Sequence, residues 1–109
     1  MTTIICDIDG VLVYHSNNPL DMKIVSGTLD KLIAWQKKGY NLILITGRRE
    51  SMRGITELQL ENAGIAYDQL IMGIGSGRRY LINDMKPDFK HTALVVNLER
   101  DEGISKVDI

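Results

Sequence analysis

The sequence predicts an α/β fold, a three-layer α/β/α sandwich of Rossmann-like type around a central, mainly parallel five-stranded sheet. Short apolar runs, which are typical of buried strands, alternate along the chain with segments in which apolar residues recur at helical spacing. Parallel strands joined through helices require right-handed crossovers, so this order favours helices packed against a sheet. Several apolar runs also end on glycine or polar residues, at the sheet edge where open α/β folds bind ligands.

The expected elements follow one another in a regular order. The run Ile4–Asp9 reads as the first strand, and the segment after it turns back at Asn17–Pro19 as a flap hairpin. Helices are expected over residues 26–38 and about 51–62, with a glycine ending each. The further strands are expected at Leu42–Thr46, Asp68–Met72, Tyr80–Ile82 and Thr92–Leu98.

Length and composition indicate a single domain over residues 1–109. Hydrophobic residues make up 44% of the chain, and 13 basic against 14 acidic side chains argue against an indiscriminate polyanion binder. The lone Cys6 excludes an internal disulfide, and no apolar stretch is long enough to span a bilayer. No basic region precedes the first apolar run, as it would in a signal peptide, so we expect a cytoplasmic protein without a membrane partner.

Two carboxylates stand at the end of the first expected strand. Side chains alternate along a strand, so Asp7 and Asp9 share one side while the backbone stays extended, and Gly10 follows at once. Two like charges this close repel each other unless a cation lies between them or one of them holds a proton. Both arrangements are typical of catalytic sites.

Polar residues also follow the second and fourth expected strands. Thr46, Gly47 and Arg48 come after the second, and Asn83 and Asp84 come after the fourth, with a further acidic residue four positions beyond Asp84. Because the carboxyl ends of parallel strands meet at one sheet edge, these loops are expected to converge on the two aspartates.

At these residues the chain resembles the haloacid dehalogenase superfamily of aspartate-nucleophile phosphotransferases. The segment Asp7–Val11 matches the first motif, Thr46 with Gly47 matches the second, and Asp84 with Asp88 matches the fourth. The resemblance spans nearly the whole chain and, in length and layout, is nearest to the small phage and bacterial proteins of the capsule-biosynthesis phosphatase group.

The resemblance implies a magnesium-dependent phosphomonoester hydrolase that works through an aspartyl phosphate. Asp7 would be the nucleophile, and Asp9 would protonate the leaving group and then deprotonate the attacking water. Mg²⁺ would be held by the Asp7 carboxylate, the Asp9 backbone carbonyl and the Asp84 carboxylate, because an all-oxygen environment suits this ion.

The remaining site residues would bind the phosphoryl group or orient other groups. Thr46 and Gly47 would hold a phosphoryl oxygen, and Arg48 would contact an anionic part of the substrate. Asn83 and Asp88 would orient the ligands around the metal.

The third motif of the family departs from the usual pattern. Relatives carry a Lys or Arg there, commonly after a glycine, but Gly73 is followed by Ile74. Arg79 is assigned to this role because it directly precedes the fourth expected strand, and Arg78 is the alternative.

The spacing of the motifs leaves no room for the lid domain that most relatives carry, so the protein is expected to be capless. A large substrate or a neighbouring subunit of a homo-oligomer would then cover the open site. A sugar phosphate or other metabolite ranks first as the substrate, ahead of a polynucleotide 3'-phosphate or a phosphoprotein. The alternative outside the enzymes is a binding protein of this fold that no longer turns over a substrate.

Overall fold

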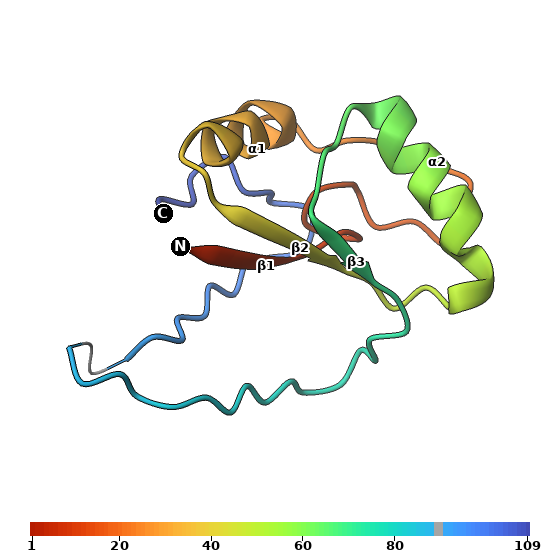
Figure 1. Cartoon of the computed structure of the whole chain (residues 1–109). Coiled ribbons are helices and arrows are strands. Elements are labelled where there is room, and N and C mark those ends of the chain that lie inside the picture. The colour runs from red at the N-terminus through yellow and green to blue at the C-terminus, as the bar shows by residue number, and fades with distance from the viewer. Residues whose placement is uncertain (89–90) are drawn as a thin grey trace.

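The computed structural model describes residues 1–88 and 91–109 and shows a parallel sheet covered by two helices (Figure 1). Strand β2 lies between β1 and β3, with Ile5 opposite Ile43 and Leu44 opposite Leu70. The α/β class predicted from the sequence is confirmed. The elements in chain order are β1 (Thr3–Asp7), α1 (Thr28–Lys37), β2 (Asn41–Ile45), the 3-10 turn η1 (Glu50–Met52), α2 (Arg53–Ala63) and β3 (Gln69–Ile71).

Helix α1 forms where the spacing predicts it and is two residues shorter at its start. Gly27 precedes it in the left-handed region at φ +86°, which glycine adopts without strain, and Gly39 follows it at φ +77°. Asp30 in the first turn and Lys37 in the last complement the helix dipole.

Helix α2 is preceded by η1 and ends at Gly64, whose φ of +78° lets the chain leave the helix sharply. The prediction of a helix from about residue 51 is therefore confirmed, with its first turn wound as a 3-10 helix. The helix buries Leu60 and Thr56.

The hydrophobic core lies between the sheet and the two helices, which cover the same face (Figure 1). Two right-handed crossovers that add strands in the order β1, β2, β3 wind in the same sense, so both helices arrive on one side. The buried core consists of Ile4, Cys6, Ile8, Leu12, Val13, Leu32, Trp35, Leu42, Leu44, Leu60, Ile65, Leu70, Met72 and Ile104.

The predicted flap hairpin is present after β1. Val13 bridges to Asp9 and, in antiparallel fashion, to Ile24. The Tyr14 amide donates to the Lys23 carbonyl at 2.8 Å. The flap therefore starts within the loop that carries the second aspartate.

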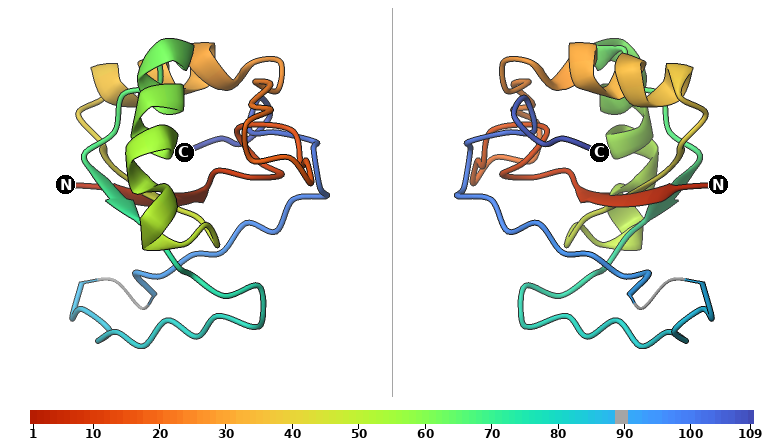
Figure 2. Two further views of the ribbon diagram at one scale, coloured as in Figure 1. Left: turned by 90° about the vertical axis from the view of Figure 1, so that its right-hand side faces the viewer. Right: turned by 90° about the vertical axis from the view of Figure 1, so that its left-hand side faces the viewer.

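The chain after β3 departs most from the sequence prediction. Tyr80–Ile82 and Thr92–Leu98 are extended but are not strands, so the five-stranded count is not confirmed. We call residues 80–88 and 91–97 the arm, which runs beneath the sheet on the side away from the helices in Figure 1 and in both views of Figure 2. The radius of gyration is 14.3 Å, whereas a compact domain of this length would have about 13 Å.

The physical reason lies in the connection before the arm. A strand exists only through hydrogen bonds to a neighbour, and a parallel crossover takes roughly a dozen residues or more. Between Met72 and Tyr80 the chain has only the glycine-rich segment 73–79. The apolar side chains of the arm remain exposed as a result, with 94% exposure at Ile82 and 86% at Leu94.

After the arm, the C-terminal segment returns to the body of the protein. The Asp101 amide donates to the Gly10 carbonyl at 2.8 Å, and Asp101 Oδ1 accepts from the His15 amide at 2.7 Å. Ile104 is buried in the core. The chain that leaves the arm is therefore attached near the loop after β1.

We predict that Gly103→Ala destabilises the protein more than Gly39→Ala. Both glycines have a φ that disfavours other residues, which costs about 1 kcal/mol or more at each position. At Gly103 an added Cβ would also lie 2.7 Å from Val25 Cγ1, whereas at Gly39 it would meet nothing within 4 Å. Urea denaturation should show an extra loss of about 1–3 kcal/mol for Gly103→Ala; equal losses would contradict this packing.

Candidate active site

The loop after β1 turns tightly at the sheet edge and presents two aspartates. The Ile8 carbonyl accepts hydrogen bonds from the Leu12 and Val13 amides, at 3.0 and 3.1 Å. Gly10 provides the left-handed residue that this turn needs, with φ +83°. Asp7 ends β1, and both aspartate side chains are about one third exposed, at 34% for Asp7 and 33% for Asp9.

Both oxygens of the Asp9 carboxylate accept hydrogen bonds from the loop after β2. Thr46 Oγ1 donates to Oδ2 at 2.8 Å, and Arg48 Nη2 donates to Oδ1 at 3.0 Å. The Arg48 amide in turn donates to Thr46 Oγ1 at 3.2 Å. Because charge-assisted hydrogen bonds are the strongest in proteins, this set fixes the orientation of Asp9.

Arg48 is also held from the other side by helix α2. Its Nη1 donates to Gln59 Oε1 at 2.7 Å and to Thr56 Oγ1 at 3.2 Å, and its side chain is largely buried. The sequence analysis missed both helix residues. Their spacing in the sequence could have revealed them, because two polar side chains at i and i+3 face the core side of α2 and need a polar partner there.

Gly47 allows the loops after β2 and β3 to approach each other. The Ile74 amide donates to the Thr46 carbonyl at 3.0 Å, and the Gly73 amide donates to the Arg48 carbonyl at 2.8 Å. An added Cβ at Gly47 would lie 3.1 Å from the Ile74 carbonyl oxygen, closer than most Cβ contacts. The backbone of Gly47 is exposed beside the aspartates.

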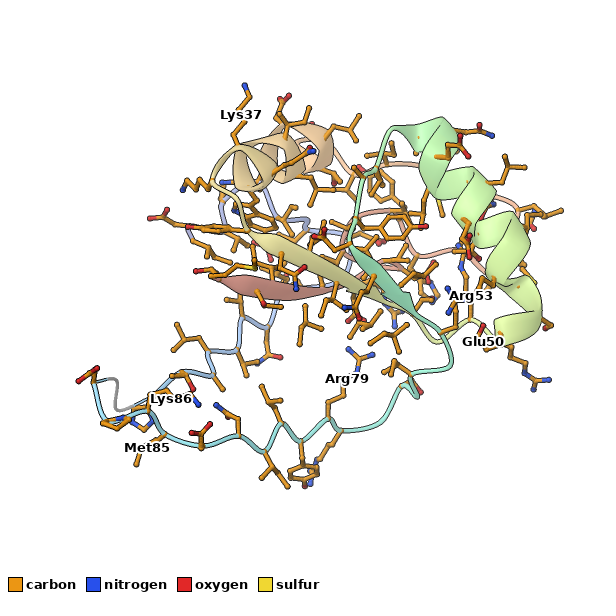
Figure 3. The ribbon with its side chains drawn as sticks, viewed as in Figure 1. Lys37, Glu50, Arg53, Arg79, Met85 and Lys86 are labelled. Carbon is orange, nitrogen blue, oxygen red and sulfur yellow. The ribbon has the colours of Figure 1, made fainter. Side chains whose placement is uncertain are left out.

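Arg79 is the basic residue that the structure brings to Asp7. Its Nη1 lies 2.9 Å from both Oδ1 and Oδ2, and the Arg79 side chain is 45% exposed. Figure 3 shows this side chain pointing from the start of the arm toward the sheet. The pair joins the loop after β3 to the carboxyl end of β1.

The residues predicted after the fourth strand are not brought to this site. Both oxygens of the Asp84 carboxylate bind Lys86 Nζ, at 2.8 and 2.9 Å, and Figure 3 shows Lys86 on the arm far from Arg79. Asn83 Nδ2 donates to Thr92 Oγ1 at 2.6 Å, and Asp88 is exposed on the arm.

The donor set for the predicted Mg²⁺ is therefore incomplete in one chain. Asp7 and Asp9 offer the oxygen atoms that the ion prefers. Within residues 1–88 and 91–109, however, no three His, Cys, Asp or Glu side chains gather in a group that could hold a metal ion. The third predicted ligand, Asp84, lies elsewhere.

Cys6 lies next to Asp7 but is unsuited to nucleophilic chemistry. Burial, with a smaller contribution from the negative charge of Asp7, raises the pKa of the Cys6 thiol to about 12. Since the thiolate is the reactive form, this cysteine is an inert core residue.

Solved structures of other proteins share the fold of this chain. A chain of the Pnkp1/Rnl/Hen1 RNA repair complex is 28% identical, with a TM-score of 0.57, over 72% of this chain and 27% of that one. A protein from Vibrio cholerae is 17% identical, with a TM-score of 0.59, over 81% of this chain and 85% of that one. The D,D-heptose 1,7-bisphosphate phosphatase from B. bronchiseptica, crystallised with magnesium and phosphate, is 21% identical, with a TM-score of 0.50, over 70% and 52%.

The fold is haloacid dehalogenase-like. This agrees with the resemblance seen in the motifs, while the assignment to the capsule-biosynthesis group stays a prediction. Neither a protein-family model nor a curated protein sequence matches the chain. The chain spans less than a third of the RNA repair protein's length.

The stretch between Asp9 and Thr46 is short, and the absence of a lid domain stays a prediction. That stretch holds only the flap, α1 and β2. The helices in the described part of the chain are too short and too polar to cross a bilayer.

We predict that Cys6 resists alkylation in the folded protein. With its pKa raised from 9.0 to about 12, the thiolate fraction at pH 8 falls by about a thousandfold relative to an ordinary thiol. A Ser51→Cys variant adds an exposed thiol in η1 as an internal reference. Mass spectrometry after iodoacetamide treatment should show one rapid adduct on that variant and none on the wild type until urea is added.

The same shift has a consequence for stability. Because the folded state holds the Cys6 proton more tightly than the unfolded chain, its contribution to stability is complete below pH 9.0 and is lost as the pH rises toward about 12. Rapid alkylation of native wild-type protein at pH 8 would contradict the burial of this side chain.

Proposed function

We propose that this chain is a phosphomonoester hydrolase that acts through an aspartyl phosphate on Asp7. The observation that carries the proposal is the Asp7–Arg79 pair at the open carboxyl end of the sheet. It places a carboxylate nucleophile beside a guanidinium, the side chain whose fork of donors best matches phosphoryl oxygens. The haloacid dehalogenase-like fold, and a neighbour described as a phosphatase, support the assignment.

In the proposed first step, an Asp7 oxygen forms a bond to phosphorus as the ester P–O bond breaks. The departing alkoxide takes a proton from Asp9, which Thr46 and Arg48 hold in a fixed orientation. In the second step, Asp9 removes a proton from water as the water oxygen attacks phosphorus. Inorganic phosphate leaves, and the Asp7 carboxylate is restored.

Arg79 and the loop after β2 would bind the phosphoryl oxygens. The guanidinium has five donors, so Arg79 can contact a phosphoryl group that enters between it and Asp7. The exposed backbone of Gly47 offers a further amide, at a position where a side chain would crowd the loop. Thr46, by contrast, donates its hydroxyl proton to Asp9 in the structure and so serves that residue first.

We propose Mg²⁺ as the cofactor, held by Asp7, the Asp9 carbonyl and Asp84. A structural neighbour crystallised with magnesium and phosphate supports the choice of ion. Asp84 must first come to the sheet edge, because in the structure it is paired with Lys86 on the arm. Asn83 and Asp88 would travel with it and orient the metal ligands.

The open site favours a substrate that brings its own bulk. A sugar phosphate or another phosphorylated metabolite remains the first candidate, and the heptose bisphosphate phosphatase among the neighbours agrees with it. A polynucleotide 3'-phosphate is the second candidate, supported by the RNA repair neighbour and by two exposed arginines beside the site loops, Arg49 and Arg78. A phosphoprotein is a third possibility, and a binding protein without turnover is the rival from another class.

We predict that wild-type protein with Mg²⁺ hydrolyses para-nitrophenyl phosphate and that Asp7→Asn lowers kcat/KM by at least about a thousandfold, because the amide cannot form the phosphoenzyme. Asp30→Asn removes an exposed carboxylate from α1 and serves as the control with unchanged activity. Absorbance of the released nitrophenolate measures both. Activity that survives Asp7→Asn would overturn the aspartyl-phosphate mechanism, and a wild type inactive on a broad phosphate panel would favour the binding protein.

The polynucleotide candidate makes a separate prediction about salt. Release of phosphate from 3'-phosphorylated oligonucleotides should fall steeply as the salt concentration rises, because phosphate contacts release counterions, while hydrolysis of a small sugar phosphate should respond weakly. An Arg49→Gln and Arg78→Gln double variant should flatten the salt response on the oligonucleotide. If the oligonucleotide is not turned over, or salt affects both substrates equally, this candidate fails.

A further inference from the structure

Strand β1 has an open edge and an uncovered face. Among the described residues it pairs only with β2, so its other edge offers backbone donors and acceptors without a strand partner. On the face turned away from the helices, Ile5 is 55% exposed and Ile71 on β3 is 41% exposed. Exposed edges of this kind are rarely left free, because they are templates for another strand.

The same chain carries a segment suited to that edge. Tyr80, Leu81 and Ile82 form an exposed run of residues that favour strands, and Leu94–Val96 form a second one on the returning half of the arm. Both runs are extended and have no strand partner among the described residues. Within residues 1–88 and 91–109, one molecule therefore contains an unpaired edge and an unpaired strand-forming segment.

The position of Arg79 argues against a parallel pairing of the arm with β1 within one chain. Its contact with Asp7 fixes the start of the arm at the carboxyl end of β1. From there the arm runs in the direction opposite to β1, as Figures 1 and 2 show. Asp84 lies five residues beyond Arg79, which corresponds to about 17 Å of extended chain. Within one chain the arm therefore carries Asp84 away from Asp7.

Reversing the arm within one chain would require breaking the Arg79–Asp7 pair. The short segment 73–79 would also have to cross from one end of the sheet to the other. Short connections of this kind are where chains exchange identical segments, because a partner's edge can be reached without the turn.

We propose that two copies of this chain exchange arms, and that residues 80–83 of each copy lie parallel to β1 along the open edge of the other. This arrangement covers the apolar run Tyr80–Ile82 of both arms and closes as a two-fold dimer, because each copy gives and receives the same segment. The ends of the arm stay on their own body, where Arg79 binds Asp7 and Asp101 binds Gly10.

The exchange also completes the active site, a part that rests on the proposed function. A parallel strand along β1 ends beside Asp7, so Asp84 of the second copy arrives where the metal needs its third carboxylate. Each site would then hold Asp7, Asp9 and Arg79 of one copy and Asp84 of the other. This accounts for the incomplete donor set of the single chain.

The first experiment measures mass and does not depend on activity. Wild-type protein in sedimentation or light scattering should have twice the 12.3 kDa of one chain. A linker of about six Gly and Ser residues inserted between Gly75 and Ser76 gives the connection the length of a crossover, so it should shift the protein to monomer. The same insertion after Asn17, in the exposed turn of the flap, is the control and should leave the dimer intact.

The second experiment mixes two variants that are each inactive, Asp7→Asn and Asp84→Asn, after unfolding and refolding them together. Half of the dimers are then mixed, and in each of these one of the two sites has both aspartates. The mixture should recover about a quarter of wild-type activity, while each variant refolded alone recovers none.

A monomeric wild type, or a linker variant that stays dimeric, would overturn the exchange. If the protein is dimeric and active but the mixture stays inactive, Asp84 acts within its own chain and the exchange is again overturned. If the wild type shows no phosphatase activity, the mass measurements still decide the exchange, and only the proposed function fails.

Discussion

The carboxylate of Asp9 is the point on which the arrangement of the site depends. It joins the loop after β1 to Thr46 and Arg48 after β2, and Arg48 also donates a hydrogen bond to Gln59 of α2. The two strands pair in parallel immediately before these loops. A buried guanidinium with several partners holds its neighbours far more rigidly than an exposed ion pair does. The carboxyl end of the sheet is therefore rigid beneath Asp7.

The rigid part of the site contrasts with the arm that follows β3. The body is built from neighbours in sequence, because each strand is paired with the next strand along the chain and each helix covers that pair. The described residues of the arm have no such local partner. Their apolar side chains can be buried only against a surface outside the arm, and the face of the sheet that the helices leave uncovered is such a surface. Strand β1, which carries Asp7, thus reaches its position by pairing with the next strand along the chain. The arm, which carries Asp84, needs a surface outside itself.

This difference also explains how far the sequence could predict the structure. Both helices and the first three strands follow local patterns, such as the apolar spacing of Leu32 and Trp35 and the glycines that end each helix, and these predictions are confirmed. The strands expected at Tyr80–Ile82 and Thr92–Leu98 depend on a distant edge, which a local pattern cannot reveal. The choice of Arg79 agrees with the contact to Asp7, whereas the place of Asp84 depends on the arm and stays a prediction.

The attachment of the C-terminal segment has a consequence for the integrity of the chain. Residues after the arm are held by the Asp101–Gly10 hydrogen bond, by the His15 amide and by the burial of Ile104. A protease that cuts once in the exposed arm would therefore produce a two-piece protein rather than a shortened one. The C-terminal piece would stay bound beside Gly10, but the arm would no longer be one stretch of chain held at both ends. The core would therefore hold together after such a cut, and only the arm depends on an unbroken chain.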